Sequence, residues 1–101
     1  MSGKYNLTCF CEKCNSGGLA TKSQKKATVG KTVAVHEDLY NRYGANHEIN
    51  ISGIGKRYIH DIHGNSKNVI DIFVNYGSDG KCACSKTQND KYNRKGVQVD
   101  F

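Results

Sequence analysis

The chain has 101 residues, of which 37% are hydrophobic and 24% are charged. This length leaves room for one domain with a single small core, which excludes a large multi-domain enzyme. There are 15 Lys and Arg residues against 9 Asp and Glu residues, so the formal net charge is +6 and an acidic, chaperone-like tail is also excluded. No apolar run approaches the ~20 residues that a membrane-spanning helix needs.

The first eight residues carry no apolar segment of the length that a signal peptide needs. We therefore expect synthesis in the cytoplasm without a signal peptide. Release at cell lysis, or association with a virion, would then replace secretion.

The first third of the chain is expected to be rich in loops around one short strand at 4–10. Proline is absent, so turns have to be formed by Gly, Asn, Asp and Ser. Further along, β-branched and alternating segments predict strands. These segments are 32–36, 47–52, 56–62, 69–76 and 96–101.

One short helix is expected at 37–43, because Gly44 stands just past its end. Five or six short strands with turns between them, and at most one short helix, are typical of a small barrel or sandwich. The predicted fold class is therefore all-β, in one domain.

Two aspartates lie in the segment 56–76, which reads as a hairpin. If the turn centres on Ser66, Asp61 and Asp71 stand opposite each other with Cβ atoms ~5 Å apart. Repulsion would then raise the pKa of one carboxyl, as a general acid working near neutral pH requires. The plainer interpretation is a turn former at Asp61 and a salt-bridged edge residue at Asp71, although a charge inside the apolar run around Asp71 needs a reason.

The order of several motifs resembles one family, the 3D domain of bacterial and phage cell-wall proteins, which is named for three aspartates. It is also similar to the catalytic part of the MltA-type lytic transglycosylases. The motifs that carry the resemblance are Tyr5, Cys11 and Cys14, the small-residue stretch of Ala20, Thr21, Lys22, Ser23, Ala27 and Gly30, then Thr32-Val33-Ala34-Val35, Gly44, Gly53-Ile54-Gly55, Tyr58, Asp61 and Ile70-Asp71-Ile72-Phe73.

The resemblance implies a small six-stranded double-psi β-barrel, with a Cys-rich arm at about 1–31 and the barrel at about 32–101. It also implies a peptidoglycan lytic transglycosylase that cleaves the MurNAc–GlcNAc bond and leaves a 1,6-anhydro sugar. By position, Asp61 would be the acid and base, while Asp71 would raise its pKa or orient the sugar. The first family aspartate falls at His36, which we include among the catalytic candidates because histidine can also exchange protons.

Substrate contacts are expected from the small-residue stretch and from side chains close to Asp61. The candidates are Thr21, Ser23, Tyr58 and His63. His63 is preferred over His60 here, because a residue next to Asp61 on a regular strand points to the opposite face.

Five cysteines suggest a clip between the two ends of the chain. They are Cys9, Cys11, Cys14, Cys82 and Cys84. Thiolates at these spacings can converge on one tetrahedral zinc ion, which would be structural because four thiolates leave no open position for water. Disulfides are the alternative in an oxidising environment, and free thiols are the third.

Lysines and arginines gather in two stretches, 22–31 and 81–95. They form either an ordinary solvated surface or a surface that attracts an anionic polymer. Peptidoglycan with its anionic cell-wall polymers is the expected partner, and nucleic acid is the other candidate. Two functions therefore stand beside the transglycosylase: a cell-wall glycan-binding module without catalysis, and a zinc-containing nucleic-acid binder.

Overall fold

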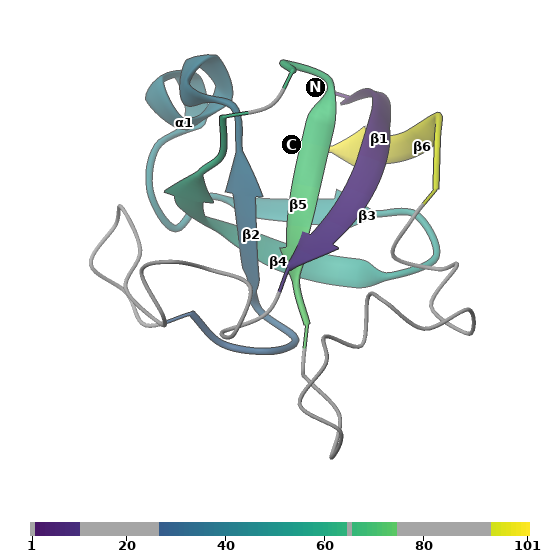
Figure 1. Cartoon of the computed structure of the whole chain (residues 1–101), viewed down its shortest axis with the longest axis horizontal. Coiled ribbons are helices and arrows are strands. Elements are labelled where there is room, and N and C mark those ends of the chain that lie inside the picture. Colours follow the sequence, from purple (N-terminus) through teal and green to yellow (C-terminus); the bar gives the residue numbers. More distant parts are fainter. Residues whose placement is uncertain (1, 11–26, 65, 75–93) are drawn as a thin grey trace.

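The computed structural model describes residues 2–10, 27–64, 66–74 and 94–101. These residues form a closed barrel of six strands in the order β1-β5-β2-β4-β3-β6, together with one short helix (Figure 1). The elements are β1 (Ser2–Phe10), β2 (Thr32–Val35), α1 (Glu37–Tyr43), β3 (Glu48–Ile51), β4 (Gly55–Ile62), β5 (Val69–Phe73) and β6 (Val97–Asp100). The predicted fold class, an all-β six-stranded barrel with at most one short helix, is confirmed.

The barrel mixes parallel and antiparallel pairs. β1 runs parallel to β5 and β2 runs parallel to β4, whereas the other four neighbouring pairs are antiparallel. Two successive strands, β1 and β2, lie on either side of β5, and the next two, β2 and β3, lie on either side of β4. The pairs β1 and β2, and β2 and β3, are thus each separated by a strand from further along the chain, as expected of a double-psi barrel, whereas β3 and β4 pair directly.

The strand patterns follow from the closed core. In β3, Ile49 and Ile51 are buried and alternate with exposed Glu48 and Asn50. All four residues of β2 are buried, because a strand with neighbours on both sides and cover on both faces has no solvent-exposed side. The buried cluster inside the barrel consists of Leu7, Val33, Val35, Ile49, Ile51, Ile59, Ile70, Ile72, Val74, Val97 and Val99.

Helix α1 follows β2 and lies beyond the upper end of that strand in Figure 1. It begins after His36 and ends at Gly44, whose φ of 89° is a conformation that side chains with a Cβ rarely adopt. Leu39, Tyr40 and Tyr43 pack against the buried cluster, so the helix presents its apolar face to the barrel.

Two expectations about the chain path are corrected by the structure. The segments around Asp61 and Asp71 do not form a hairpin, because β4 and β5 each pair with β2, which lies between them. The barrel also begins before residue 32, since β1 is one of its strands. Among the described residues, no helix has the length and apolar character needed to cross a membrane.

Candidate functional site

The two predicted aspartates lie on opposite sides of one small residue, Ala34. In the β2·β4 pair Ala34 is in register with Asp61, and in the β2·β5 pair it is in register with Asp71. Their Cα atoms are therefore two strand spacings apart, roughly 10 Å instead of the ~5 Å that a hairpin would give. The predicted pairing of Asp61 directly opposite Asp71 is wrong, because β2 separates the two residues.

A fourth residue, Thr8, extends this arrangement onto β1, where it is in register with Asp71. Asp71 lies between inward-facing Ile70 and Ile72 and so faces outward, where its carboxylate Oδ1 accepts a hydrogen bond from the Thr8 hydroxyl at 3.0 Å. We call the set Thr8, Asp71, Ala34 and Asp61 the carboxylate row. It crosses four strands, in the order β1, β5, β2, β4.

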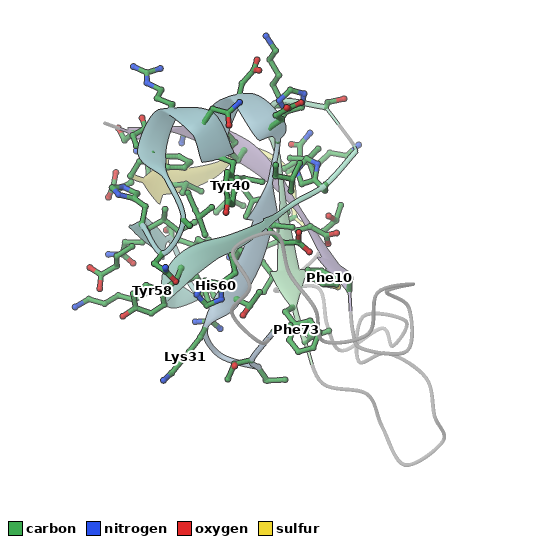
Figure 2. All side chains as sticks on the ribbon, turned by 90° about the vertical axis from the view of Figure 1, so that its left-hand side faces the viewer. Phe10, Lys31, Tyr40, Tyr58, His60 and Phe73 are labelled. Carbon is green, nitrogen blue, oxygen red and sulfur yellow. The ribbon has the colours of Figure 1, made fainter. Side chains whose placement is uncertain are left out.

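The environment of Asp71 favours its protonated form. The side chain is half-buried, and this burial raises the pKa of the carboxyl above its ordinary value. The Thr8 hydrogen bond and the charge of His63 act in the opposite direction and lower the pKa, but their effects are smaller. Two residues further along the same strands, the rings of Phe10 and Phe73 pack edge-on with centroids 5.2 Å apart, so an apolar contact lies near the carboxyl. Figure 2 labels these two rings.

His63 follows β4 and reaches toward the beginning of β5. Its Nε2 lies 2.6 Å from the carbonyl oxygen of Val69. Because a carbonyl oxygen only accepts hydrogen bonds, Nε2 must carry the proton of this contact. The charge of His63 lowers the pKa of Asp71, and the predicted role of His63 in substrate binding beside Asp61 stays a prediction.

His36 has a structural task at the start of α1. Its Nδ1 accepts a hydrogen bond from the backbone N–H of Asp38 at 3.1 Å, so the imidazole is the N-cap of the helix. The ring centroid lies 6.5 Å from that of His63. An ion pair between His36 Nδ1 and Asp38, at 3.9 Å, would need a proton on the atom that accepts the cap hydrogen bond. The hydrogen bond from the Asp38 N–H is therefore the contact that fixes the His36 imidazole.

Asp61 owes its place in the row to an irregularity in β4. Val33 is in register with Ile59, and the next residue, Ala34, is in register with Asp61, so His60 is an extra residue in the parallel ladder. This is a β-bulge, which allows two residues of one strand to face one residue of the other. The Asp61 carboxylate Oδ1 accepts a hydrogen bond from the backbone N–H of Ile62 at 2.9 Å.

Tyr58 is a further predicted site residue within the described part of the chain, and it does not belong to the row. Tyr58 is in register with Thr32, two residues before Ala34, and its hydroxyl donates to Glu48 at 3.3 Å. Thr21 and Ser23 lie outside the described residues, as do Cys11, Cys14, Cys82 and Cys84. Cys9 is disulfide-bonded, which for this residue agrees with the disulfide alternative. Within the described part of the chain no cluster of three or more metal-binding side chains occurs, and the zinc clip stays a prediction.

Sequence reasoning missed Thr8 and Ala34. Thr8 alternates with Leu7 and Cys9, which contact the core, so the pattern of its strand could have placed it on the outer face. Its partner could not be deduced, because Asp71 lies 63 residues away. Ala34 gave no signal beyond its small size within a β-branched run.

Comparison of the chain with protein-family models, with curated proteins and with solved structures finds no significant match.

Proposed function

We propose that this chain is a peptidoglycan lytic transglycosylase that cleaves between N-acetylmuramic acid and N-acetylglucosamine and leaves a 1,6-anhydro product. The observation that carries the proposal is the half-buried Asp71 carboxyl, whose pKa is raised by burial and whose Oδ1 is held by Thr8. A carboxyl whose pKa is raised above its ordinary value is what general acid catalysis of glycosidic cleavage requires. The order of the motifs that resemble the 3D domain supports the same activity.

The geometry suggests how one carboxyl would serve both steps. The Thr8 hydroxyl donates to Oδ1, so Oδ2 is the oxygen that would carry the acidic proton. Oδ2 would give this proton to the glycosidic oxygen as the bond from that oxygen to C1 of the muramic acid breaks. The resulting carboxylate would then take the proton of the C6 hydroxyl as O6 bonds to C1. The acid is thereby restored, and no water is consumed.

This proposal exchanges the roles that the resemblance implies for the two aspartates. Asp71 is the acid and base here, because burial raises the pKa of its carboxyl and Thr8 fixes it in place. Asp61, on the other side of Ala34, would orient the sugar.

Digestion of purified sacculi, followed by mass spectrometry of the fragments, tests the proposal. We expect anhydro-muropeptides from the unaltered chain and a loss of rate of about 10²- to 10⁴-fold in Asp71→Asn, the range for a general acid. Asp100→Asn is the matched control, because it removes one exposed carboxylate at the end of β6. The rate should fall as the pH rises through the raised pKa of Asp71, because the acid form is then lost.

Other outcomes of the digestion would overturn the proposal in distinct ways. Products with ordinary reducing ends would identify a hydrolase that uses water as the nucleophile. Full activity in Asp71→Asn would exclude Asp71 as the acid.

A glycan-binding module without catalysis is the second candidate, and His36 favours it. The residue at the first aspartate position of the 3D domain is here a helix cap and supplies no carboxylate. Co-sedimentation with sacculi, without any release of fragments, would support this candidate. If neither cleavage nor binding occurs, salt-dependent binding to RNA or DNA tests the remaining prediction, since phosphate contacts weaken as salt rises.

A further inference from the structure

We propose that the β-bulge at His60 aims the Asp61 carboxylate toward Asp71, and that His60 is a positioning residue held in place by Thr32. The inference deepens the proposed function and rests on it where catalysis is concerned. The structural part of the inference is that the position of Asp61 depends on the bulge. This part can be tested by NMR, whether or not the protein has catalytic activity.

The register shows what the bulge achieves. If the β2·β4 ladder were regular beyond Val33 and Ile59, Ala34 would face His60, and Asp61 would face Val35. Val35 is fully buried inside the barrel, so Asp61 would place a carboxylate in the apolar core. The extra residue brings Asp61 back to Ala34, and therefore into the carboxylate row.

The bulge is held by hydrogen bonds that involve side chains with little or no solvent exposure. His60 is 9% exposed and Thr32 is 0% exposed. The Nδ1 of His60 lies 2.8 Å from the Thr32 hydroxyl, and the same hydroxyl accepts the backbone N–H of Thr28 at 2.9 Å. Buried polar groups are nearly always paired in this way, and breaking one pair leaves the other group unsatisfied.

These contacts link the bulge to the turn that leads into β2. The backbone carbonyl of Thr28 accepts hydrogen bonds from the N–H groups of Lys31 and Thr32, at 3.1 and 3.0 Å. The Tyr58 ring lies nearly parallel to the imidazole of His60, with ring centroids 6.4 Å apart. Figure 2 shows the two side chains next to each other. The imidazole is thus held by the hydrogen bond to Thr32 and flanked by an aromatic neighbour, as a positioning residue requires.

Bulges are frequent next to active sites, where they change the direction of a side chain. His60 itself is too enclosed to contact a substrate. Its effect on the reaction would pass through Asp61, the next residue in the chain.

The experiment compares Thr32→Val with Thr32→Ser in the full chain. Thr32→Val keeps the β-branched shape and removes the hydroxyl that binds His60, whereas Thr32→Ser keeps the hydroxyl. In ¹⁵N and ¹³C NMR spectra we expect Thr32→Val to shift the Ile62 amide, which donates to Asp61, and the Asp61 carboxyl carbon. We expect Thr32→Ser to leave both signals close to those of the unaltered chain. The Asp71 carboxyl signal should move little in either variant.

The second measurement is the rate of sacculus digestion by each variant. We expect Thr32→Val to lower kcat by about 10- to 100-fold with little change in KM, because misplacement of the orienting Asp61 carboxylate by about 1 Å would misalign the sugar with the Asp71 carboxyl, and misalignments of this size have such effects. Thr32→Ser should restore most of the rate. His60→Asn, which retains a hydrogen-bonding group near Nδ1, should fall between the two.

The outcomes separate this inference from the proposed function. If the Ile62 and Asp61 signals stay unchanged in a folded Thr32→Val protein, the bulge does not depend on His60 and Thr32, and the inference is overturned whatever the activity. If these signals move but the unaltered chain releases no fragments from sacculi, the structural inference holds and the proposed function fails. Equal losses of kcat in Thr32→Val and Thr32→Ser would also contradict a positioning role.

Discussion

The two parallel strand pairs of the barrel reach the same row of residues by different means. In β1·β5, five successive residues of β1, Asn6–Phe10, pair with Val69–Phe73 without interruption. In β2·β4 the register shifts after Val33, and an extra residue precedes Asp61. The regular pair holds one carboxyl by direct contact between neighbouring strands. In the bulged pair, the position of the Asp61 carboxyl depends on the buried His60. We therefore expect the geometry of this pair to be more sensitive to single substitutions than that of β1·β5.

The largest effect should come from residues that flank Val33 on its two sides. Ile72 of the antiparallel β2·β5 pair and Ile59 of the bulged pair are both in register with Val33, and both are fully buried. Ile72→Ala and Ile59→Ala should each lower the free energy of unfolding by about 2–5 kcal/mol, because each leaves a cavity in the core. Urea denaturation measures both losses.

The matched substitutions Ile72→Val and Ile59→Val should cost only about 0.5–1.5 kcal/mol. A loss below about 1 kcal/mol in Ile59→Ala alone would mean that the bulged side contributes little to the core. The contrast between the two sides would then be one of stability as well as of geometry.

The next effect concerns pH and belongs to the regular pair. Burial raises the pKa of Asp71 above its ordinary value, so the folded state holds this proton more tightly than the unfolded state does. The associated stabilisation is complete below the ordinary pKa of 3.8 and is lost as the pH rises through the raised pKa. Relative to Asp71→Asn, the unaltered chain should therefore become less stable across this interval, by about 1.4 kcal/mol for each unit of pKa difference.

Thr8→Val provides the matched test of this prediction. The Thr8 hydrogen bond lowers the pKa of Asp71, so its removal should raise the pKa further and extend the loss of stability to higher pH. Thermal unfolding at a series of pH values measures both variants. An identical pH dependence in Thr8→Val and the unaltered chain would show that this hydrogen bond does not act on Asp71 in solution.

A smaller effect is expected at the end of β2, where His36 is the cap of α1. His36→Ala should lower the unfolding free energy by about 1 kcal/mol, the usual loss for a helix N-cap, while His36→Asn should retain most of it. Thermal unfolding monitored by circular dichroism compares the two. Equal stability of both variants would show that the cap contact contributes nothing, and the helix would then depend on its packing alone.

The smallest effect concerns the exposed ion pair between Lys67 and Asp38, which joins the segment before β5 to α1 after β2. The Nζ–Oδ2 distance is 2.9 Å, and the hydrogen bond from Lys67 lowers the pKa of Asp38. Lys67→Gln should return the pKa of Asp38 toward its ordinary value, as NMR titration can measure. The melting temperature should hardly change, because exposed ion pairs contribute little. A large loss of stability would mean that this pair fastens the two strand pairs to each other.

The elements of the barrel could be predicted from the sequence, but their neighbours could not. Alternation identified β3, and Gly44 marked the end of α1, because both signals are local. The expected hairpin was wrong because β2, a strand from 26 or more positions earlier than Asp61, lies between β4 and β5. No local sequence pattern indicates that a distant strand lies between two successive ones.

For the same reason, only part of the candidate site could be predicted from the sequence. Asp71 is noticeable in the sequence as a charge inside an apolar run, and the structure places its side chain in a half-buried position. Thr8 and Ala34 became site residues only through pairing between distant strands. The bulge could not be predicted from Tyr58-Ile59-His60-Asp61-Ile62. The same sequence could also form a regular strand, in which Asp61 would face inward.

The interleaved strand order also governs how the protein reaches its folded state. Thr8 and Asp71 are 63 residues apart, and Ala34 and Asp61 must insert from between them. Contacts of such long range form slowly, because the entropy of closing the chain is lost before the pairing is gained. The carboxylate row is therefore complete only when β1, β5, β2 and β4 have all paired. In refolding experiments, any activity should return with the pairing of these four strands and not with the earlier appearance of secondary structure.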